Sequence, residues 1–174
     1  MAHFSITNRN NVKTLEIEDF AAKSSLPYLN FTGNGFVEFS STSNNDIPIK
    51  VNAKKSGKFL IDFKYSNGSG PWNTENKCAI RSLYANGKYI GALVFPQRGT
   101  DLWSDWAYSN SYYVELKKGN NWVDIKFEDW NNNMNVDTNK MMLDHYRQTK
   151  NMLISYNKNK LGLKSFYGIG VPNN

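Results

Sequence analysis

Two glutamates near the start of the chain could hold a metal ion. Glu16 and Glu18 are two residues apart in "LEIED", and on an extended strand this spacing projects both side chains from one face. Carboxylates so close repel each other, and a hard cation such as Ca²⁺, which takes about six to eight oxygen ligands, would remove the repulsion. Asp144 in "MMLDHY" would supply a third carboxylate if the first and last strands are neighbours. The spacing also fits two glutamates on an exposed sheet face.

The segment "FPQRGTDLWSDW" contains two tryptophans among residues typical of an exposed loop. Trp103 and Trp106 are three residues apart, so in an extended segment they face opposite sides. We expect Trp106, nearer to the following strand, to be buried and Trp103 to be displayed. An exposed indole offers a flat face on which a sugar ring or a nucleic-acid base can stack. Alternatively, both rings could close the open end of a β-sandwich.

The residues needed for catalysis are poorly represented. The two histidines are His3, close to the start of the sequence, and His145, which follows Asp144 on a predicted strand and would face the opposite way. Cys78 is the only cysteine, which excludes an internal disulfide and a thiolate metal cluster, and we interpret it as a small buried residue. The acidic residues are scattered, and no Gly-rich phosphate-binding loop is present.

The elements that must position these residues are predicted to be strands. Short alternating apolar runs recur along the chain, whereas helical periodicity is nearly absent. Asn86–Gly87 between two strong runs predicts a hairpin, because a type I′ turn needs positive φ at both central positions. We predict an all-β fold, a jelly-roll β-sandwich of two antiparallel sheets. The predicted strands begin at Thr14, Gly35, Ile47, Gly57, Lys77, Lys88, Ser111, Asn121 and Met141.

Length and charge limit the possible classes of protein. The 174 residues suit one domain, and we predict a sandwich module over residues 1–150, followed by an extension, extra strand or linker over 151–174. The net charge of +6 admits an acidic partner, such as nucleic acid or a uronate-containing polysaccharide. The lysines are spread along the sequence, with pairs starting at Lys54 and Lys117, so we expect a solvated surface and no nucleic-acid partner. No apolar run is long enough to span a bilayer, and we expect no membrane partner.

The order of several motifs resembles that of the carbohydrate-binding modules of families six and thirty-five, and most closely thirty-five. The resemblance extends from about Leu15 to Tyr146. It implies a calcium-containing β-sandwich without catalytic activity, which directs an attached polysaccharide-degrading enzyme to its glycan. The motifs are "LEIEDF", "NFTGNGFVEF", "SGKFLIDFKYSNG", "LYANGKYIGALVFPQRGTDLWSDW", "YYVELKKGNNWVDIKF" and "LDHY".

The resemblance also implies which residues bind the structural calcium ion. Glu16 and Glu18 match the acidic pair of the family's first strand, and Asp144 matches the aspartate of its closing "D-H" strand. These three residues are therefore the predicted metal ligands. With the resemblance included, the metal site is favoured over two exposed glutamates.

A sugar site at the loop end is implied in the same way. Trp103 is similar to the stacking tryptophan of the family's "W-x-x-W" loop, and Asn67 falls in a segment that resembles its "RYANG" loop. Met142 stands where family members often have an asparagine that contacts sugar, so we expect this hydrogen bond to come from elsewhere, for example from Asn135. The complete set of predicted carbohydrate-binding residues is Tyr28, Asn30, Asn34, Asn67, Trp72, Arg98, Trp103 and Asn135.

We therefore predict a non-catalytic module that binds a polysaccharide or oligosaccharide and belongs with the catalytic domain of a glycoside hydrolase or polysaccharide lyase. The expected location is extracellular or periplasmic, with this sequence as a mature or excised piece. One alternative is a structural sandwich that packs on a catalytic domain without binding sugar, with Trp72 and Trp103 in the interface. Another is a domain that is itself a hydrolase or lyase, and nucleic-acid binding ranks last.

Overall fold

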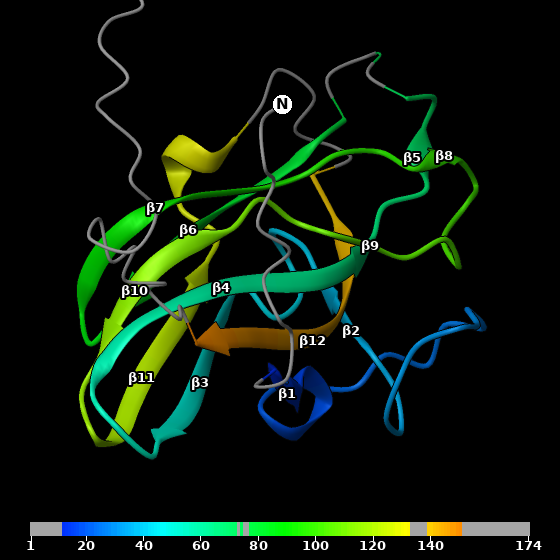
Figure 1. Ribbon diagram of the computed structural model, residues 1–174. Helices are drawn as coiled ribbons and strands as arrows, with labels where there is room; N and C mark the ends of the chain where they lie inside the picture. Colours follow the sequence, from blue (N-terminus) through cyan, green and yellow to red (C-terminus); the bar gives the residue numbers. More distant parts are fainter. Residues whose placement is uncertain (1–11, 73, 75–76, 133–138, 151–174) are drawn as a thin grey trace, which may run out of the picture.

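Short antiparallel strands make up most of the structure (Figure 1). The computed structural model describes residues 12–72, 74, 77–132 and 139–150. Two 3₁₀ helices accompany the strands in these residues, η1 (Ile17–Asp19) and η2 (Asp129–Asn131). The strands are β1 (Val12–Glu16), β2 (Val37–Phe39), β3 (Asp46–Ala53), β4 (Gly57–Ser66), β5 (Ser69–Gly70), β6 (Ala79–Ala85), β7 (Lys88–Phe95), β8 (Gly99–Thr100), β9 (Ala107–Tyr108), β10 (Tyr112–Leu116), β11 (Gly119–Lys126) and β12 (Met141–Lys150).

The strands form two principal sheets. The larger has the order β1-β12-β4-β10, with β2 paired to β12 and β9 paired to β4. The smaller has the order β3-β11-β6-β7, and a short separate ladder joins β5 to β8. All of these pairings are antiparallel. The predicted all-β sandwich of two antiparallel sheets is confirmed.

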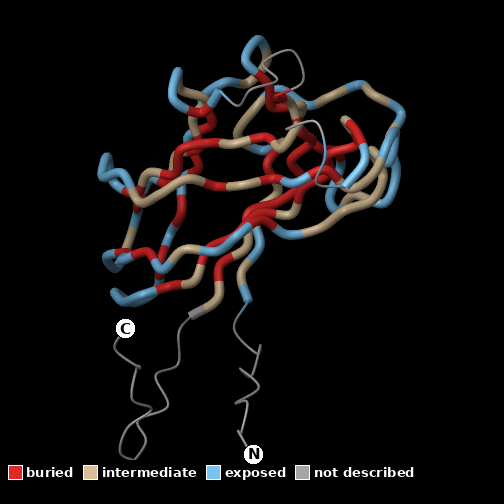
Figure 2. The backbone as a smooth tube through the Cα atoms, turned by 90° about the horizontal axis from the view of Figure 1, so that it is seen from above, coloured by how far each residue is buried: buried red, intermediate tan, exposed pale blue. Residues whose placement is uncertain are grey.

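The core lies between the two sheets, as the alternation of apolar residues predicts. In β3, Ile47, Ile49 and Val51 are fully buried while the residues between them are exposed, because successive strand residues point to opposite faces. Phe59, Ile61 and Phe63 of β4 belong to the same buried cluster. Each fully buried side chain of this size contributes roughly 1.5–3 kcal/mol relative to exposure. Figure 2 shows buried residues along the strands and exposed residues at the turns.

The predicted hairpin between β6 and β7 is present. Asn86 and Gly87 have φ angles of 49° and 78°, as a type I′ turn requires. The Asn86 amide donates to the Trp122 carbonyl at 2.8 Å, which ties the turn to the neighbouring strand β11. This turn is therefore held in place by a second strand as well as by its own geometry.

Strands β1 and β12 are neighbours, as the metal-site prediction requires. Glu16 lies opposite His145 in their antiparallel ladder. Strand β1 ends at Glu16, however, so the prediction of one continuous strand through Glu18 is wrong: Glu18 lies in η1. Because the chain turns into η1 after Glu16, Glu18 does not continue the direction of β1.

Two predictions fall on residues that the structure does not describe. Asn135 and the expected extension over 151–174 both lie outside the described residues. Within the residues that are described, no helix has the length and apolar character needed to cross a bilayer.

Candidate functional site

Thr32 lies at the centre of a cluster of acidic and histidine side chains. Its amide donates to both Asp144 carboxylate oxygens at 3.1 Å. Its hydroxyl is 3.0 Å from Glu16 Oε2 and 2.8 Å from His145 Nδ1. One ligand atom from each of Glu16, Asp144 and His145 lies within 4.8 Å of the other two, so these residues could hold a metal ion.

Glu18 reaches the same region from η1. The Asn34 amide donates to Glu18 Oε1 at 2.8 Å. A Cβ on Gly33 would lie 2.7 Å from Glu18 Oε1 and 2.8 Å from Glu16 Cγ, so the backbone of Gly33 passes between the two glutamates. Glu18 Oε2 is buried and has no hydrogen-bond partner among the described residues. An unpartnered buried carboxylate oxygen close to a second carboxylate, that of Glu16, is an arrangement that fits a hard cation.

A β-bulge explains why two successive residues of β12 reach one cluster. The register of β12 against β4 shifts between Leu143 and His145. A bulge redirects side chains that would otherwise alternate between the faces of a sheet. Asp144 and His145 are therefore both buried, and both contact Thr32. The prediction that His145 faces away from Asp144 is wrong for this reason.

The cluster carries an excess of negative charge. Burial, together with the charges of Asp144 and Glu18, raises the pKa of Glu16 despite the hydrogen bond from Thr32. Burial also raises the pKa of Asp144, but hydrogen bonds from His145 and Lys64 outweigh it and hold the pKa below its ordinary value. Lys64 Nζ is 2.7 Å from Asp144 Oδ2. Three carboxylates and one ammonium leave a formal charge of −3 + 1 = −2, which a divalent cation would neutralise.

Trp103 and Trp106 are both half-buried, so the prediction of one displayed and one buried ring is wrong. The Tyr28 ring stacks on Trp103 with centroids 5.7 Å apart and planes 15° apart. A Cβ on Gly68 would lie 2.8 Å from three atoms of the five-membered ring of Trp103, so the Gly68 backbone lies against that ring. Lys140 Nζ is 5.2 Å from the centroid. Trp103 consequently has little free face for a ligand.

Trp106 joins two loops that are distant in sequence. Its indole N–H donates to the Leu29 carbonyl at 2.7 Å, and the Leu29 amide donates to Ser104 Oγ at 2.9 Å. Its ring meets Phe36 edge-on at 5.7 Å. The aromatic residues of these loops therefore close one end of the sandwich, which is the alternative that the sequence left open.

Trp72 is an open indole at this end of the molecule. Its residue surface is 64% exposed. The Arg98 guanidinium is 6.0 Å from the Trp72 ring centroid and forms an ion pair with Asp105 at 3.1 Å. A pocket of about 340 Å³ lies here, with Trp72, Arg98 and Tyr108 among its lining residues. In such a site the exposed aromatic face can stack on a sugar ring, and the neighbouring cation and carboxylate can hydrogen-bond to the hydroxyl groups of the sugar.

Tyr108 connects this pocket to the acidic cluster. Its hydroxyl lies 3.2 Å from His145 Nε2, on the opposite side of the imidazole from Thr32. The Arg147 guanidinium carbon is 3.4 Å from the centroid of the Tyr108 ring. The wall of the pocket is thus held by the same histidine that lies in the candidate metal cluster.

Asn67 has a different place from the one predicted. It is fully buried, and its side-chain N–H groups donate to the carbonyls of Lys77 and Phe95 at 3.1 and 2.9 Å. Its side-chain oxygen accepts from the amide and hydroxyl of Ser69. The donors and the acceptor of this side chain are therefore used within the protein. The Asn67 carbonyl accepts from the Arg98 amide at 2.7 Å, so Asn67 positions Arg98.

The remaining predicted sugar contacts are divided between two regions. Asn30 and Asn34 are exposed, but they lie in the loop around Thr32, beside the acidic cluster. Tyr28 is part of the aromatic stack with Trp103. Met142 lies in β12, and its side chain is fully buried in the protein. Of the predicted set, Trp72 and Arg98 are the pair that the structure brings together around a pocket.

Comparisons with known proteins place the fold. No family model matches the chain. Over 146 residues it is 28% identical to a cycloisomaltooligosaccharide glucanotransferase of Niallia circulans, covering 82% of this chain and 14% of that protein. The chain thus spans about a seventh of the length of that relative.

Two solved structures carry the same fold. A family 35 carbohydrate-binding module from Clostridium thermocellum has a TM-score of 0.61 and 18% identity, over 81% of this chain and 99% of that one. The Paenibacillus sp. cycloisomaltooligosaccharide glucanotransferase complexed with cycloisomaltoheptaose has a TM-score of 0.62 and 21% identity, over 82% of this chain and 19% of that one. This chain has the β-sandwich fold of the family 35 modules.

Proposed function

We propose that this chain, whose fold is that of the family 35 carbohydrate-binding modules, is a non-catalytic module that binds an oligosaccharide or polysaccharide within a larger carbohydrate-active enzyme. The observation that carries the proposal is the open Trp72 ring beside Arg98 at the mouth of a pocket. Such a module raises the local concentration of an attached catalytic domain at its glycan. An extracellular or periplasmic location would follow from this role.

The Trp72 pocket suits a neutral sugar ring. Trp72 would stack on the C–H face of the ring, and Arg98 and Asp105, which pair with each other, would hydrogen-bond to hydroxyl groups. Because Asp105 already neutralises the charge of Arg98, this ion pair does not favour a charged ligand over a neutral one. The names of the relatives make isomaltooligosaccharides the first ligands to test.

A structural calcium ion is the second part of the proposal. Glu16, Glu18 and Asp144 would hold it. Glu16 and Asp144 belong to the group whose ligand atoms lie within 4.8 Å of one another, and the buried unpartnered Glu18 Oε2 supports the inclusion of Glu18. The ion would supply charge neutralisation rather than chemistry. The residues around it brace His145, and His145 in turn holds Tyr108 in the wall of the sugar pocket.

The sugar site is tested by calorimetric titration of linear isomaltooligosaccharides into wild type, Trp72→Ala and Trp122→Ala. Trp122 is a matched control because it is another open indole, 48% exposed, on a different part of the surface. Trp72→Ala should weaken binding about tenfold or more, since a stacked ring is worth on the order of 1–3 kcal/mol. Trp122→Ala should leave the affinity within about twofold.

The opposite pattern would move the site. If Trp122→Ala weakens binding and Trp72→Ala does not, the ligand binds the outer face of the smaller sheet. If no glycan of a broad panel binds to wild-type protein that retains its cooperative thermal unfolding, the module does not recognise sugar.

The alternative function, a structural domain that packs on a catalytic domain, has one observation in its favour. The outer face of the smaller sheet carries a row of aromatic rings. Trp122 and Tyr89 are exposed, Tyr84 meets Tyr89 edge-on at 5.5 Å, and Trp130 covers Ser82 through a 3.0 Å hydrogen bond. Exposed aromatic rows of this kind mark interaction surfaces. The titration described above separates this alternative from the sugar module.

A further inference from the structure

Six lysines gather at the end of the sandwich opposite the Trp72 pocket. They lie in or next to the β3–β4, β6–β7 and β10–β11 turns, and all six are exposed. Among the described residues, the acidic side chain that accompanies them is Glu115, which is 4.0 Å from Lys58. These seven side chains together carry a formal charge of +6 − 1 = +5. The lysines are Lys54, Lys55, Lys58, Lys88, Lys117 and Lys118.

Hydrogen bonds hold the three turns together. The Lys118 amide donates to Ser56 Oγ at 2.8 Å, which joins the β10–β11 turn to the β3–β4 turn. The buried Asn121 accepts from the Lys117 amide and from the Asn86 side chain, both at 3.0 Å, which joins the β6–β7 turn as well. The backbone that carries the lysines is thus fixed before any ligand arrives. Residues on an ordered backbone lose less entropy on binding than residues on mobile loops.

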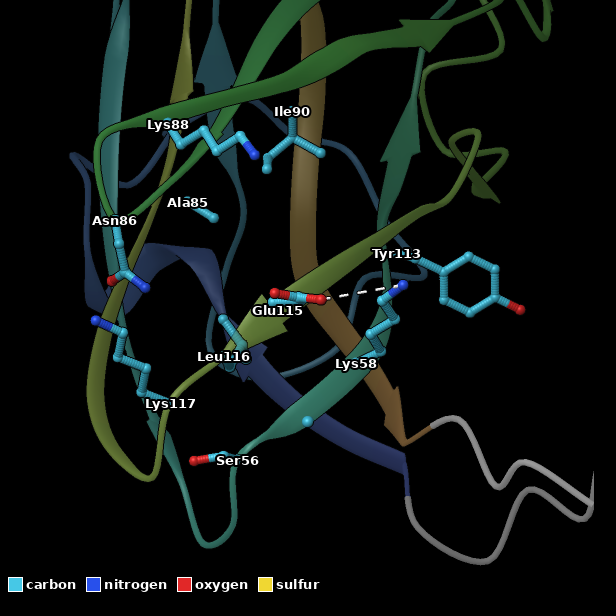
Figure 3. Close-up of a pocket in the computed structure, with 11 residues that line it drawn as sticks. Ser56, Lys58, Ala85, Asn86, Lys88, Ile90, Tyr113, Glu115, Leu116 and Lys117 are labelled. Carbon is cyan, nitrogen blue, oxygen red and sulfur yellow. Dashed lines mark ion pairs between the residues drawn. The ribbon is translucent and has the colours of Figure 1, made fainter. Parts of the chain in front are cut away.

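The same end is hollowed. A groove of about 690 Å³ lies between the edge strands β7 and β10, which is within the roughly 300–1,000 Å³ range of ligand pockets. Figure 3 shows Lys88, Lys117 and Lys58 around the hollow, with Ile90 and Leu116 between them. Ammonium groups surrounding a partly apolar floor suit a ring that carries anionic substituents.

We propose that this turn end is a second binding surface, specific for an anionic polysaccharide. Its lysines would bind carboxylate or sulfate groups, while one sugar ring occupies the groove over Ile90. The surface differs from the Trp72 pocket in both charge and position. Strand β4 runs from Gly57 at the turn end to Ser66 at the loop end, and its ten residues separate the two by roughly 30 Å.

Two observations favour a glycan over other polyanions. A single-stranded nucleic acid site needs aromatic faces for the bases, whereas Tyr113, the aromatic residue of this groove, points away from the hollow (Figure 3). A membrane-binding surface needs apolar side chains that project into the lipid, whereas the rim of this groove is charged. A recessed groove of this size fits a single ring better than the flat backbone of a duplex.

The test compares affinities for dextran, dextran sulfate and polygalacturonate at several salt concentrations. The proteins are wild type, Lys88→Gln/Lys117→Gln, and the charge-matched control Lys50→Gln/Lys126→Gln from the smaller sheet. We expect wild type to bind one or both anionic polymers. The affinity should fall as salt rises, because the lysines displace counterions that are condensed on the polymer. The turn-end variant should bind about tenfold more weakly, and the control should bind within about twofold.

Four results would overturn the proposal. The first two are no binding of wild type to either anionic polymer, and equal weakening of that binding by both double variants. Oligothymidylate and vesicles containing phosphatidylserine serve as competing probes, and tighter binding of wild type to either one than to the anionic polymers is the third or fourth. Dextran sulfate and polygalacturonate distinguish sulfate from carboxylate recognition. Trp72→Ala should leave the binding of polygalacturonate unchanged, because that polymer lacks the glucan backbone expected to bind the Trp72 pocket, so failure here and failure of the neutral sugar site are distinguishable.

Discussion

Asn67 is the side chain on which the geometry of the loop end depends most directly. Its buried amide binds the carbonyls of Lys77 and Phe95 and both polar groups of Ser69. Its own carbonyl holds the amide of Arg98. A single asparagine thus links three segments of chain behind the Trp72 pocket.

Asn67→Ala should lower the free energy of unfolding by about 2–4 kcal/mol, because it leaves buried donors and acceptors without partners. Asn120→Ala is the control, since Asn120 is exposed and its side chain accepts one hydrogen bond, from Asn52; we expect a change below about 1 kcal/mol. Urea denaturation of both variants measures the difference. Equal effects would show that the Asn67 network contributes little to stability.

At the scale of elements, the loop that carries Thr32 and Gly33 must pass between three carboxylates. Gly33 has a φ of 65°, and its missing side chain leaves the space that Glu16 and Glu18 occupy. The bulge in β12 brings Asp144 and His145 to the same loop. The candidate metal site is therefore built from a loop, a 3₁₀ turn and a bulge, which are all departures from regular strand geometry.

Gly33→Ala should destabilise the protein more than Gly87→Ala. Both glycines have positive φ, so both variants incur a backbone cost of roughly 1–2 kcal/mol. A Cβ at Gly87 meets nothing within 4 Å, whereas one at Gly33 displaces the glutamates. We expect an additional loss of about 1 kcal/mol or more for Gly33→Ala in urea denaturation. Equal losses would mean that the carboxylates move aside without cost.

At the scale of the whole molecule, the acidic cluster joins β1 and β12, the first and last strands of the described residues. Glu16 lies at the end of the first strand, and Asp144 and His145 lie in the last. Strand β12 also pairs with β4 in the middle of the larger sheet. An ion held between β1 and β12 would stabilise the folded state as a whole, because the unfolded chain has no preformed site.

Calcium should therefore raise the thermal unfolding temperature. At a free concentration of about one hundred times Kd the stabilisation is about 2.7 kcal/mol, which corresponds to a shift of several degrees for a chain of this size. Glu18→Gln should abolish the shift seen by scanning calorimetry with calcium and with chelator. Asp19→Asn, an exposed carboxylate in the same 3₁₀ turn, should retain it. A shift that survives in Glu18→Gln would place the ion elsewhere.

Several features of this protein were determined by the sequence alone, because they depend on neighbouring residues. The alternation from Asp46 to Ala53 predicts a strand with one buried face, and Asn86–Gly87 predicts the turn that the structure contains. The sequence also predicts Glu16 and Asp144 as members of one site, and the structure places their side chains close together, with His145. In each case the information lies within a few residues or in a pattern along the chain.

Other features were decided by the tertiary structure, because they depend on segments that meet only in the folded chain. The packing of Tyr28 and Gly68 covers the Trp103 ring, and a bulge that no local pattern reveals sets the position of His145. The lysine pairs at Lys54 and Lys117 read as scattered charge in the sequence. Strand pairing brings them together, because the register of antiparallel strands places their turns at one end of the sandwich.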